Sequence, residues 1–320
     1  MSDVFERIRA AAARVSATAR HVRIDTAGLE ALCERIAGAP PLATSPDPAH
    51  RPLRDSEQTL AFVLSLDAIN FGSGWFPLLR KREWRSGYLS IATSLREHFE
   101  SQGAWDAPAL RRVTPADMGR ILGQQGVGAE IDALMALYAQ ALNDLGHFLG
   151  ERFEGSFAGP VRAAAGHGAA LVELLAEMPF YRDVACYDGH PVPLYKRAQI
   201  TVSDLANAFA GEGPGHFEDR ARLTIFADNL VPHVLRLDGV LVYEAELLAR
   251  IEAGREIAAG SPEEVEIRAV ALHAVELCVD RLRAAGVDTS AERLDHWLWN
   301  RGQRPEIKAH PRHRTRTVYY

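Results

Sequence analysis

The sequence lacks the features that mark a secreted, disulfide-held or membrane-spanning protein. It has only three cysteines, far apart in sequence, which form neither a disulfide framework nor a C-x-x-C metal site. No run of about 18 apolar residues is present, so no membrane span is expected. The amphipathic N-terminal segment also differs from an apolar secretory signal. These absences favour a cytoplasmic protein.

Positive charge is also scarce. The 36 lysines and arginines are outnumbered by 42 aspartates and glutamates, which gives a formal net charge of −6. Proteins that bind duplex nucleic acid usually present a basic face, so no stable nucleic-acid complex is expected. Residues 310–320 are basic and end in Val318-Tyr319-Tyr320. They form either a solvated tail or an anion-binding segment that folds back.

Familiar catalytic signatures are missing as well. The chain has no P-loop, no dinucleotide-binding glycine motif after a strand and no nucleophile elbow. Although it has 12 histidines, only His310 and His313 lie close together in sequence. No helix therefore offers two histidines at the i, i+4 spacing of a metal site, and we expect neither a metal nor any other cofactor.

Helical periodicity dominates what is present. The chain is 47% hydrophobic and 24% charged, which is typical of a folded globular protein. Residues 184–194 are the one strand-like stretch, with a turn signal at Tyr187-Asp188-Gly189 that predicts a small β-hairpin. Apolar stripes and helix caps predict the helices, which lie at 4–18, 57–70, 86–99 and 130–150 and after Thr114-Pro115, Ser261-Pro262 and Thr289-Ser290.

The fold class is therefore mainly α with a small β-hairpin. We expect a single helical domain over residues 1–320, with residues 1–54 as an N-terminal helical extension and a proline-rich connection at 38–52. Gly126-Val127-Gly128 resembles the turn of a helix–hairpin–helix, although a plain linker between helices is the simpler interpretation.

Three segments carry unusual polar residues. Asp67 and Asn70 stand at i, i+3 in an apolar stretch, where they either end or cap a helix or form a hydrogen-bonding pair in a pocket. Lys196 and Arg197 stand where the hairpin enters a helix, which suits either a phosphate site or an ordinary cationic surface. Asp228 interrupts an apolar run before Pro232. It is interpreted as the N-cap of a helix at 229–237, as a catalytic carboxylate, or as both.

At these segments the chain resembles the queuosine-salvage protein family, the queuosine 5'-phosphate N-glycosylases. The resemblance extends in order from about residue 55 to the C-terminus. The matching motifs are Leu66-Asp67-Ala68-Ile69-Asn70-Phe71, Tyr195-Lys196-Arg197-Ala198-Gln199-Ile200, Phe226-Ala227-Asp228 with Val231-Pro232, Glu264-x-Glu266-Ile267-Arg268-Ala269, Leu298-Trp299 and His313-Arg314-Thr315-Arg316.

The resemblance implies a fold similar to that of helix–hairpin–helix DNA glycosylases. It also implies metal-free hydrolysis of queuosine 5'-phosphate to queuine and ribose 5-phosphate, a salvage step connected with tRNA modification. The chain departs from the expected pattern in three places: Asn229 replaces an aromatic residue, His233 replaces glutamine, and Pro311-Arg312 interrupts a histidine pair before His313.

N-glycosidic cleavage develops positive charge on the anomeric carbon, which a carboxylate beneath the sugar can stabilise or attack. We assign this role to Asp228, with Asp204 as the alternative carboxylate. Asp67 and Asn70 are candidates to contact the edge of the base, and Phe71 or Trp299 to stack on its face. The candidates for the 5'-phosphate are cations, namely Lys196, which we also count as catalytic, Arg197, His233, Arg314 and Arg316.

Two other functions compete with this hypothesis. A base-excising glycosylase acting on a polynucleotide would need a positive track for the backbone, which the acidic composition disfavours. A non-catalytic helical module that binds a nucleoside or a protein would share the same helical pattern, because a fold alone does not establish chemistry.

Overall fold

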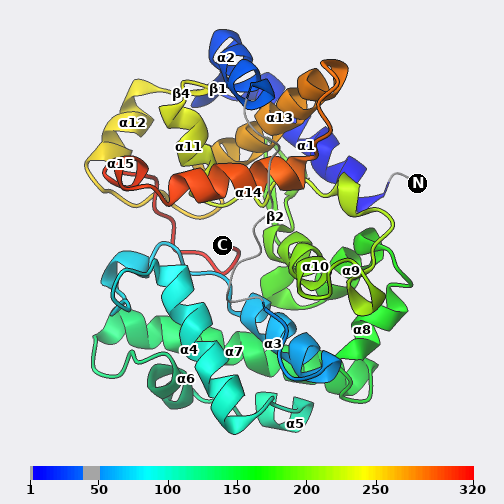
Figure 1. Cartoon of the computed structure of the whole chain (residues 1–320). Helices are drawn as coiled ribbons and strands as arrows, with labels where there is room; N and C mark the ends of the chain where they lie inside the picture. The colour runs from blue at the N-terminus through cyan, green and yellow to red at the C-terminus, as the bar shows by residue number, and fades with distance from the viewer. Residues whose placement is uncertain (1–2, 39–50) are drawn as a thin grey trace. The chain divides into compact units, whose positions relative to one another are not determined.

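The computed structural model describes residues 3–38 and 51–320 and confirms the mainly helical fold class (Figure 1). Contacts divide the chain into two compact units, neither of which is continuous in sequence. The described residues of unit 1 are 3–38, 183–196 and 221–316; those of unit 2 are 51–182, 197–220 and 317–320. Most of the connection expected at 38–52 lies outside the described residues. Across the described ranges, no helix has the length and apolar character needed to cross a bilayer.

Unit 1 combines helices with two small antiparallel sheets, which pair β1 with β4 and β2 with β3. Its elements are α1 (Val4–Thr18), β1 (Val22–Ile24), α2 (Thr26–Ala37), β2 (Val184–Tyr187), β3 (His190–Pro193), α11 (Val231–Leu237), β4 (Leu241–Tyr243), α12 (Ala245–Glu252), α13 (Pro262–Ala284), α14 (Ala291–Gly302) and α15 (Pro305–Lys308).

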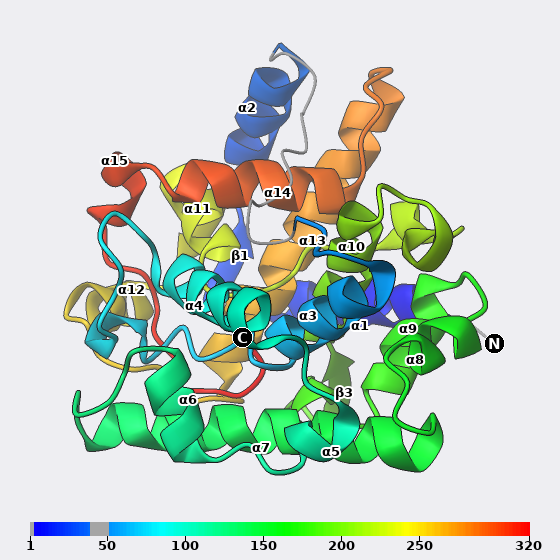
Figure 2. The same cartoon turned by 60° about the horizontal axis from the view of Figure 1, so that its bottom comes forward.

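Helix α13 is the centre of unit 1. It begins as the sequence predicts, because Ser261 accepts a hydrogen bond from the N–H of Glu264 and Pro262 occupies the first turn. Its buried residues occupy more than one face, and α13 packs against α1, α2, α11 and α14 (Figures 1 and 2). The contact with α2 brings the free thiols of Cys33 and Cys278 to 3.0 Å, although they are far apart in sequence.

A single buried carboxylate on α13 fixes the end of α1 and the start of β1. Glu266 accepts hydrogen bonds from the backbone N–H groups of Arg20, His21 and Val22 at 3.0, 2.6 and 3.0 Å. The hydroxyl of Tyr187 on β2 donates a fourth bond at 2.7 Å. Four donors therefore depend on one side chain with no solvent exposure.

We predict that Glu266→Ala lowers the free energy of unfolding by about 3–5 kcal/mol, because it leaves several buried donors without an acceptor. Urea unfolding measures the change. The matched control is Glu276→Ala on the same helix, which removes one bond from Arg9 and is expected to cost about 1 kcal/mol. Equal losses in the two variants would contradict a special role for Glu266.

The predicted β-hairpin is confirmed as β2 and β3, with Val184 opposite Pro193 and Tyr187 opposite His190. Asp188 and Gly189 both have positive φ, at 48° and 78°, as a tight two-residue hairpin turn requires. The β1–β4 pair was not expected from the sequence, because each strand has only three residues.

Unit 2 is helical. Its elements are α3 (Ser56–Ala68), α4 (Gly87–Gln102), α5 (Ala107–Leu110), α6 (Pro115–Ile121), α7 (Ala129–Arg152), α8 (Ala158–Ala163), α9 (Gly168–Leu175), α10 (Lys196–Ala208, from Arg197 onward) and the single-turn 3-10 helices Phe76–Leu78, Pro179–Tyr181 and Gly213–Gly215.

The long helix α7 runs beside α5 and α6 in both views (Figures 1 and 2). Helix α6 begins with the predicted cap, now seen as a reciprocal capping box between Thr114 and Asp117. Gly126 and Gly128, which precede α7, have positive φ of 69° and 147°. The likeness to helix–hairpin–helix glycosylases stays a prediction.

Candidate active site

Asp228 lies in unit 1, three residues before α11. This helix begins at Val231 with Leu230 as its N-cap, so the helix predicted at 229–237 begins two residues later and Asp228 is not its N-cap residue. Its Oδ1 accepts hydrogen bonds from the backbone N–H groups of Leu230 at 2.7 Å and Val231 at 3.0 Å. Among the residues that the structure describes, its Oδ2 accepts none. The side chain is only partly buried. One oxygen is thus fixed by the backbone, while the other is available to a ligand.

Three titratable groups, Asp295, Lys196 and Arg312, lie in the electrostatic neighbourhood of Asp228. Burial raises the pKa of Asp295 well above its ordinary value, and the negative charge of Asp228 raises it further, while the N–H of Phe226 and the charge of Lys196 act in the opposite direction. Burial also lowers the pKa of Arg312, which the negative charge of Asp228 opposes. Asp228 therefore shares one neighbourhood with a second carboxyl and two cations.

Asp295 lies on α14 and accepts a hydrogen bond from the N–H of Phe226 at 2.9 Å, two residues before Asp228. Trp299, the predicted stacking residue, lies one turn further along the same helix. Residues at i and i+4 share a helix face, so Asp295 and Trp299 are neighbours on α14. Trp299 is partly exposed.

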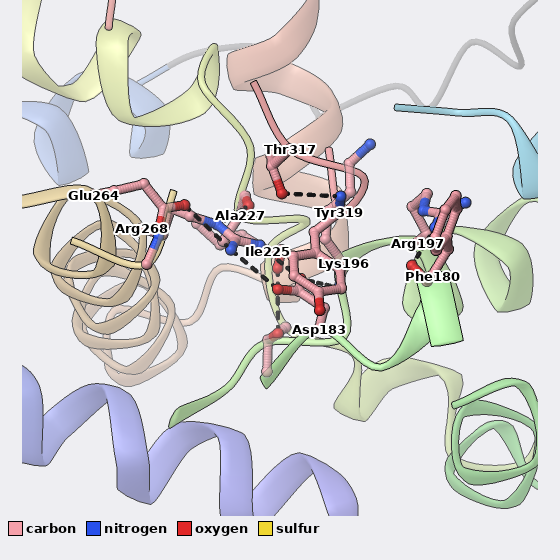
Figure 3. A network of polar contacts seen from close by, with 12 residues as sticks. Phe180, Asp183, Lys196, Arg197, Ile225, Ala227, Glu264, Arg268, Thr317 and Tyr319 are labelled. Carbon is pink, nitrogen blue, oxygen red and sulfur yellow. Dashed lines mark hydrogen bonds and ion pairs between the residues drawn. The ribbon is translucent and has the colours of Figure 1, made fainter. Parts of the chain in front are cut away.

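Lys196 is the first residue of α10 and is almost fully buried. Its backbone N–H donates to Asp183 Oδ2 at 3.1 Å. Both oxygens of Asp183 also accept from the guanidinium of Arg268, and the Nε of Arg268 donates to the carbonyl of Ala227 at 2.8 Å. Figure 3 shows this network, which includes the peptide adjoining Asp228.

His233 on α11 is buried and neutral at ordinary pH. Its Nε2 lies 3.2 Å from the carbonyl of Ile307, to which it donates, and its Nδ1 lies 3.3 Å from the guanidinium of Arg236, from which it accepts. Burial lowers its pKa to about 4, and the charge of Arg236 contributes to the lowering. His233 therefore supplies no positive charge at neutral pH, and its expected contact with the phosphate stays a prediction.

We predict that His233 makes the fold sensitive to acid. An unfolded histidine has a pKa of about 6.5, which is higher than the folded value of about 4. The unfolded state therefore binds the proton first, and stability is lost as the pH falls from about 6.5 to about 4. The loss is about 2–3 kcal/mol, measured as the free energy of unfolding at each pH.

The control is His233→Gln, because a glutamine amide can donate to Ile307 and its carbonyl can accept from Arg236, yet it does not titrate. The variant should lose less stability than the wild type over this pH range. Parallel stability curves would show that another group sets the acid sensitivity. His313, whose pKa burial lowers to about 3, remains in both proteins.

The C-terminal basic segment is not a solvated tail. Arg314 accepts a backbone hydrogen bond from Ile257 at 2.8 Å through its carbonyl, and Arg316 pairs with Glu256. His313 is 2% exposed. Residues 311–316 are thus packed within unit 1. The guanidinium of Arg314 donates to the carbonyl of Gly254 at 3.3 Å, whereas Arg312 makes no hydrogen bond to the described residues.

In unit 2, two of the other predicted residues, Asp67 and Phe71, contact one buried guanidinium, that of Arg197. Arg197 donates to the carbonyls of Asp67 and Ala68 at 3.3 and 2.6 Å, and Figure 3 shows its contact with the carbonyl of Phe180. The guanidinium carbon lies 4.8 Å from the ring centre of Phe71 and 4.6 Å from that of Tyr181. Arg197 therefore joins several segments of unit 2.

The two predicted carboxylates of unit 2, Asp67 and Asp204, both lie in the electrostatic neighbourhood of Tyr181, next to Arg197. Burial raises the pKa of Tyr181, and the negative charges of Asp67 and Asp204 raise it further. Asn70 lies beyond the end of α3 at Ala68, so the predicted helix at 57–70 is two residues too long. The expected contacts of these residues with the substrate stay predictions.

Sequence reasoning did not assign roles to three residues of the unit 1 site. Arg268 appeared only as part of a motif that resembles the queuosine-salvage family, and no role was predicted for Asp183 or Asp295. One signal was available for Asp295, because it adjoins the apolar stripe of α14 formed by Ala291, Leu294 and Leu298, where a carboxylate is unusual. Asp183 offered no comparable signal.

Other features of the described residues do not suggest a second chemical site. In residues 3–38 and 51–320, no three His, Cys, Asp or Glu side chains are grouped as metal ligands. A cavity of about 270 Å³ in unit 2 is lined by Ala158, Val161, Arg162, Ala165, Gly166, Gly213, Pro214 and His216. Its lining includes no carboxylate.

Comparison with known families identifies the relatives of this chain. The model of the family described as "Queuosine salvage protein" matches residues 50–320, a range that contains all the predicted site residues. The chain belongs to this family. The resemblance expected from the sequence motifs is therefore confirmed.

Several curated relatives bear the name queuosine 5'-phosphate N-glycosylase/hydrolase. The one from Sphaerobacter thermophilus is 41% identical over 278 residues, which is 83% of each chain. The one from Dictyostelium discoideum is 30% identical over 98% of each chain, and that of Mus musculus is 38% identical over 58% of each chain. The first two matches extend over most of both proteins.

Proposed function

We propose that this chain hydrolyses the N-glycosidic bond of queuosine 5'-phosphate and releases queuine and ribose 5-phosphate. The substrate class comes from the names of its relatives. The structural observation that carries the proposal is the geometry of Asp228. A carboxylate held through one oxygen by two backbone N–H groups, with the other oxygen open, suits a group that must meet a developing positive charge.

In this mechanism Asp228 acts on the anomeric carbon. As the bond to the base breaks, the ribose acquires oxocarbenium character, and the negative charge of Asp228 stabilises that state or adds to the carbon. Water then completes the hydrolysis and supplies the hydroxyl of the ribose 5-phosphate. The backbone bonds to Oδ1 keep the carboxylate in place and spare it from reorienting during the reaction.

Asp295 is the candidate acid in the same unit. Its raised pKa favours the protonated carboxyl, which can donate a hydrogen bond or a proton, whereas Asp228 serves as the anion. Two carboxyl groups in different environments commonly divide acid and anion roles in this way. The departing deazapurine lacks a protonatable N7, so it depends on donors at its other ring-edge atoms.

Lys196 and Arg312 are the candidate cations for the 5'-phosphate. Both lie near the carboxylate pair, and Arg312 has no hydrogen bond to another described residue. A guanidinium without such a bond can still offer its full set of donors to a phosphate. Cytoplasmic location and the absence of a stable nucleic-acid complex belong to the same proposal.

The test supplies the purified protein with queuosine 5'-phosphate, queuosine and a tRNA that contains queuosine, and follows free base by chromatography. We expect rapid release from the nucleotide and none from the intact tRNA, with the same rates after treatment with a strong chelator. Faster release from tRNA, weakening steeply with salt, would instead support a polynucleotide glycosylase.

A further inference from the structure

Asp183 holds the short turn that delivers Lys196 to the start of α10. Its backbone carbonyl accepts the N–H groups of Leu194 and Tyr195 at 2.9 and 3.2 Å, and its Oδ2 accepts that of Lys196 at 3.1 Å. Tyr195 has a φ of 46°, in the left-handed region that costs a non-glycine residue energy and requires support from its surroundings. The backbone position of Lys196 therefore depends on Asp183.

Arg268 connects this turn to the segment that carries Asp228. Its two terminal nitrogens bond the two oxygens of Asp183 at 3.0 and 2.6 Å, while its Nε bonds the carbonyl of Ala227 at 2.8 Å. The side chains of Asp183 and Arg268 are only 3% and 2% exposed. A single planar group thus joins the side chain of Asp183 to the backbone of Ala227, away from solvent (Figure 3).

We infer that Asp183 and Arg268 are positioning residues, which set the placement of Lys196 relative to Asp228. Asp183 holds the backbone of Lys196, and Arg268 joins the carboxylate of Asp183 to the carbonyl of Ala227. The inference rests on the proposed function, in which Lys196 and Asp228 act on one substrate. Reacting groups must be held closely, since a displacement of about 1 Å can lower a rate about 100-fold. The pair touches no reacting atom itself.

The guanidinium shape, more than its charge, makes the connection possible. A buried ion pair often contributes little net stability, because desolvation offsets the attraction. A planar fork, however, can bond a carboxylate and a carbonyl at the same time, and a lysine ammonium at the end of a flexible chain cannot reproduce that geometry. Arg268→Lys therefore keeps the positive charge while breaking at least one of the two attachments.

The experiment compares Arg268→Lys with Arg301→Lys. Arg301 makes a similar fork to Asp238 in the same unit, but that fork touches neither Asp183 nor Ala227. We expect Arg268→Lys to lower kcat by about 10- to 100-fold per folded molecule with little change in KM, and Arg301→Lys to change kcat by less than about threefold. Equal effects of the two variants on kcat would overturn the inference.

Two further readouts separate positioning from general stability. In a Lys196→Ala background, Arg268→Lys should cost less than about threefold, because groups that act as a unit are not additive. An undiminished cost there would overturn the inference. Amide hydrogen exchange, which needs no activity, should speed up at both Lys196 and Phe226–Val231 in Arg268→Lys and at neither in Arg301→Lys. Faster exchange in only one of these segments, or in neither, would overturn the inference. This readout does not depend on activity. Failure of the wild type to release base would overturn the proposed function and not this inference.

Discussion

Asp228→Asn is expected to lower kcat for release of queuine by about 100- to 1,000-fold while the protein stays folded. Asparagine caps helices nearly as well as aspartate, so its carbonyl oxygen can still accept the N–H groups of Leu230 and Val231. The substitution removes the negative charge that faces the anomeric carbon. Thermal unfolding within a few degrees of the wild type, together with steady-state kinetics, measures both expectations.

The matched control is Asp25→Asn. Asp25 is the N-cap of α2 in the same unit and accepts the N–H of Gly28 at 3.0 Å, so both variants change a carboxylate that is bonded to backbone N–H near the start of a helix. This variant should keep wild-type kcat. A folded Asp228→Asn protein with near wild-type turnover would show that another carboxylate, with Asp295 or Asp204 as the candidates, performs the chemistry.

Arg312→Gln is expected to lower kcat/KM for queuosine 5'-phosphate by about 10- to 150-fold, the cost of one charge-assisted phosphate contact of about 1.5–3 kcal/mol. The rate with queuosine, which lacks the phosphate, should change by less than about threefold.

The point substitution is preferable to a chain truncated after Ala309. Truncation would remove the buried His313 and Tyr320, and with them the carbonyl of Tyr320, which accepts the N–H of Gly72 within unit 2.

Arg314 was a sequence candidate for the phosphate, but its guanidinium donates to the carbonyl of Gly254, and we propose Arg312 in its place. Arg314→Gln is therefore the control for charge, because it removes one cation from the same segment. It should treat both substrates as the wild type does. Lys196→Ala should lower the rate with the phosphorylated substrate as well. If Arg312→Gln and Arg314→Gln impair both substrates alike, the basic segment supports the fold and recognises no phosphate.

The parts of the fold that follow from local chemistry were predictable. The helix at 4–18, the caps at Thr114, Ser261 and Ser290 and the turn at Asp188-Gly189 depend on residues within one or two turns of the chain. The helix after Asp228 was also predicted, although it begins at Val231 with Leu230 as its N-cap and not at Asn229. Element ends shifted by one or two residues, as at α3, where the backbone bonds near Ile69 end the helix.

The rest required tertiary contacts. Asp183, Lys196, Ala227 and Arg268 come from three distant stretches of sequence. Only folding places the guanidinium of Arg268 against both Asp183 and Ala227. Asp295 gains its altered pKa from burial and from Asp228, neither of which its own helix encodes. The division into two units, each made of separate stretches, depends on long-range packing and has no local signal.

The most direct test of the central claim is a count of turnovers with free queuosine 5'-phosphate in large excess over the protein. Each sample is analysed for queuine and ribose 5-phosphate, with Asp228→Asn treated in parallel. We predict many molecules of base released per protein molecule, matched one to one by ribose 5-phosphate, and almost none from the variant. Tight binding of the nucleotide without release of base, or equal release by wild type and Asp228→Asn, would contradict it.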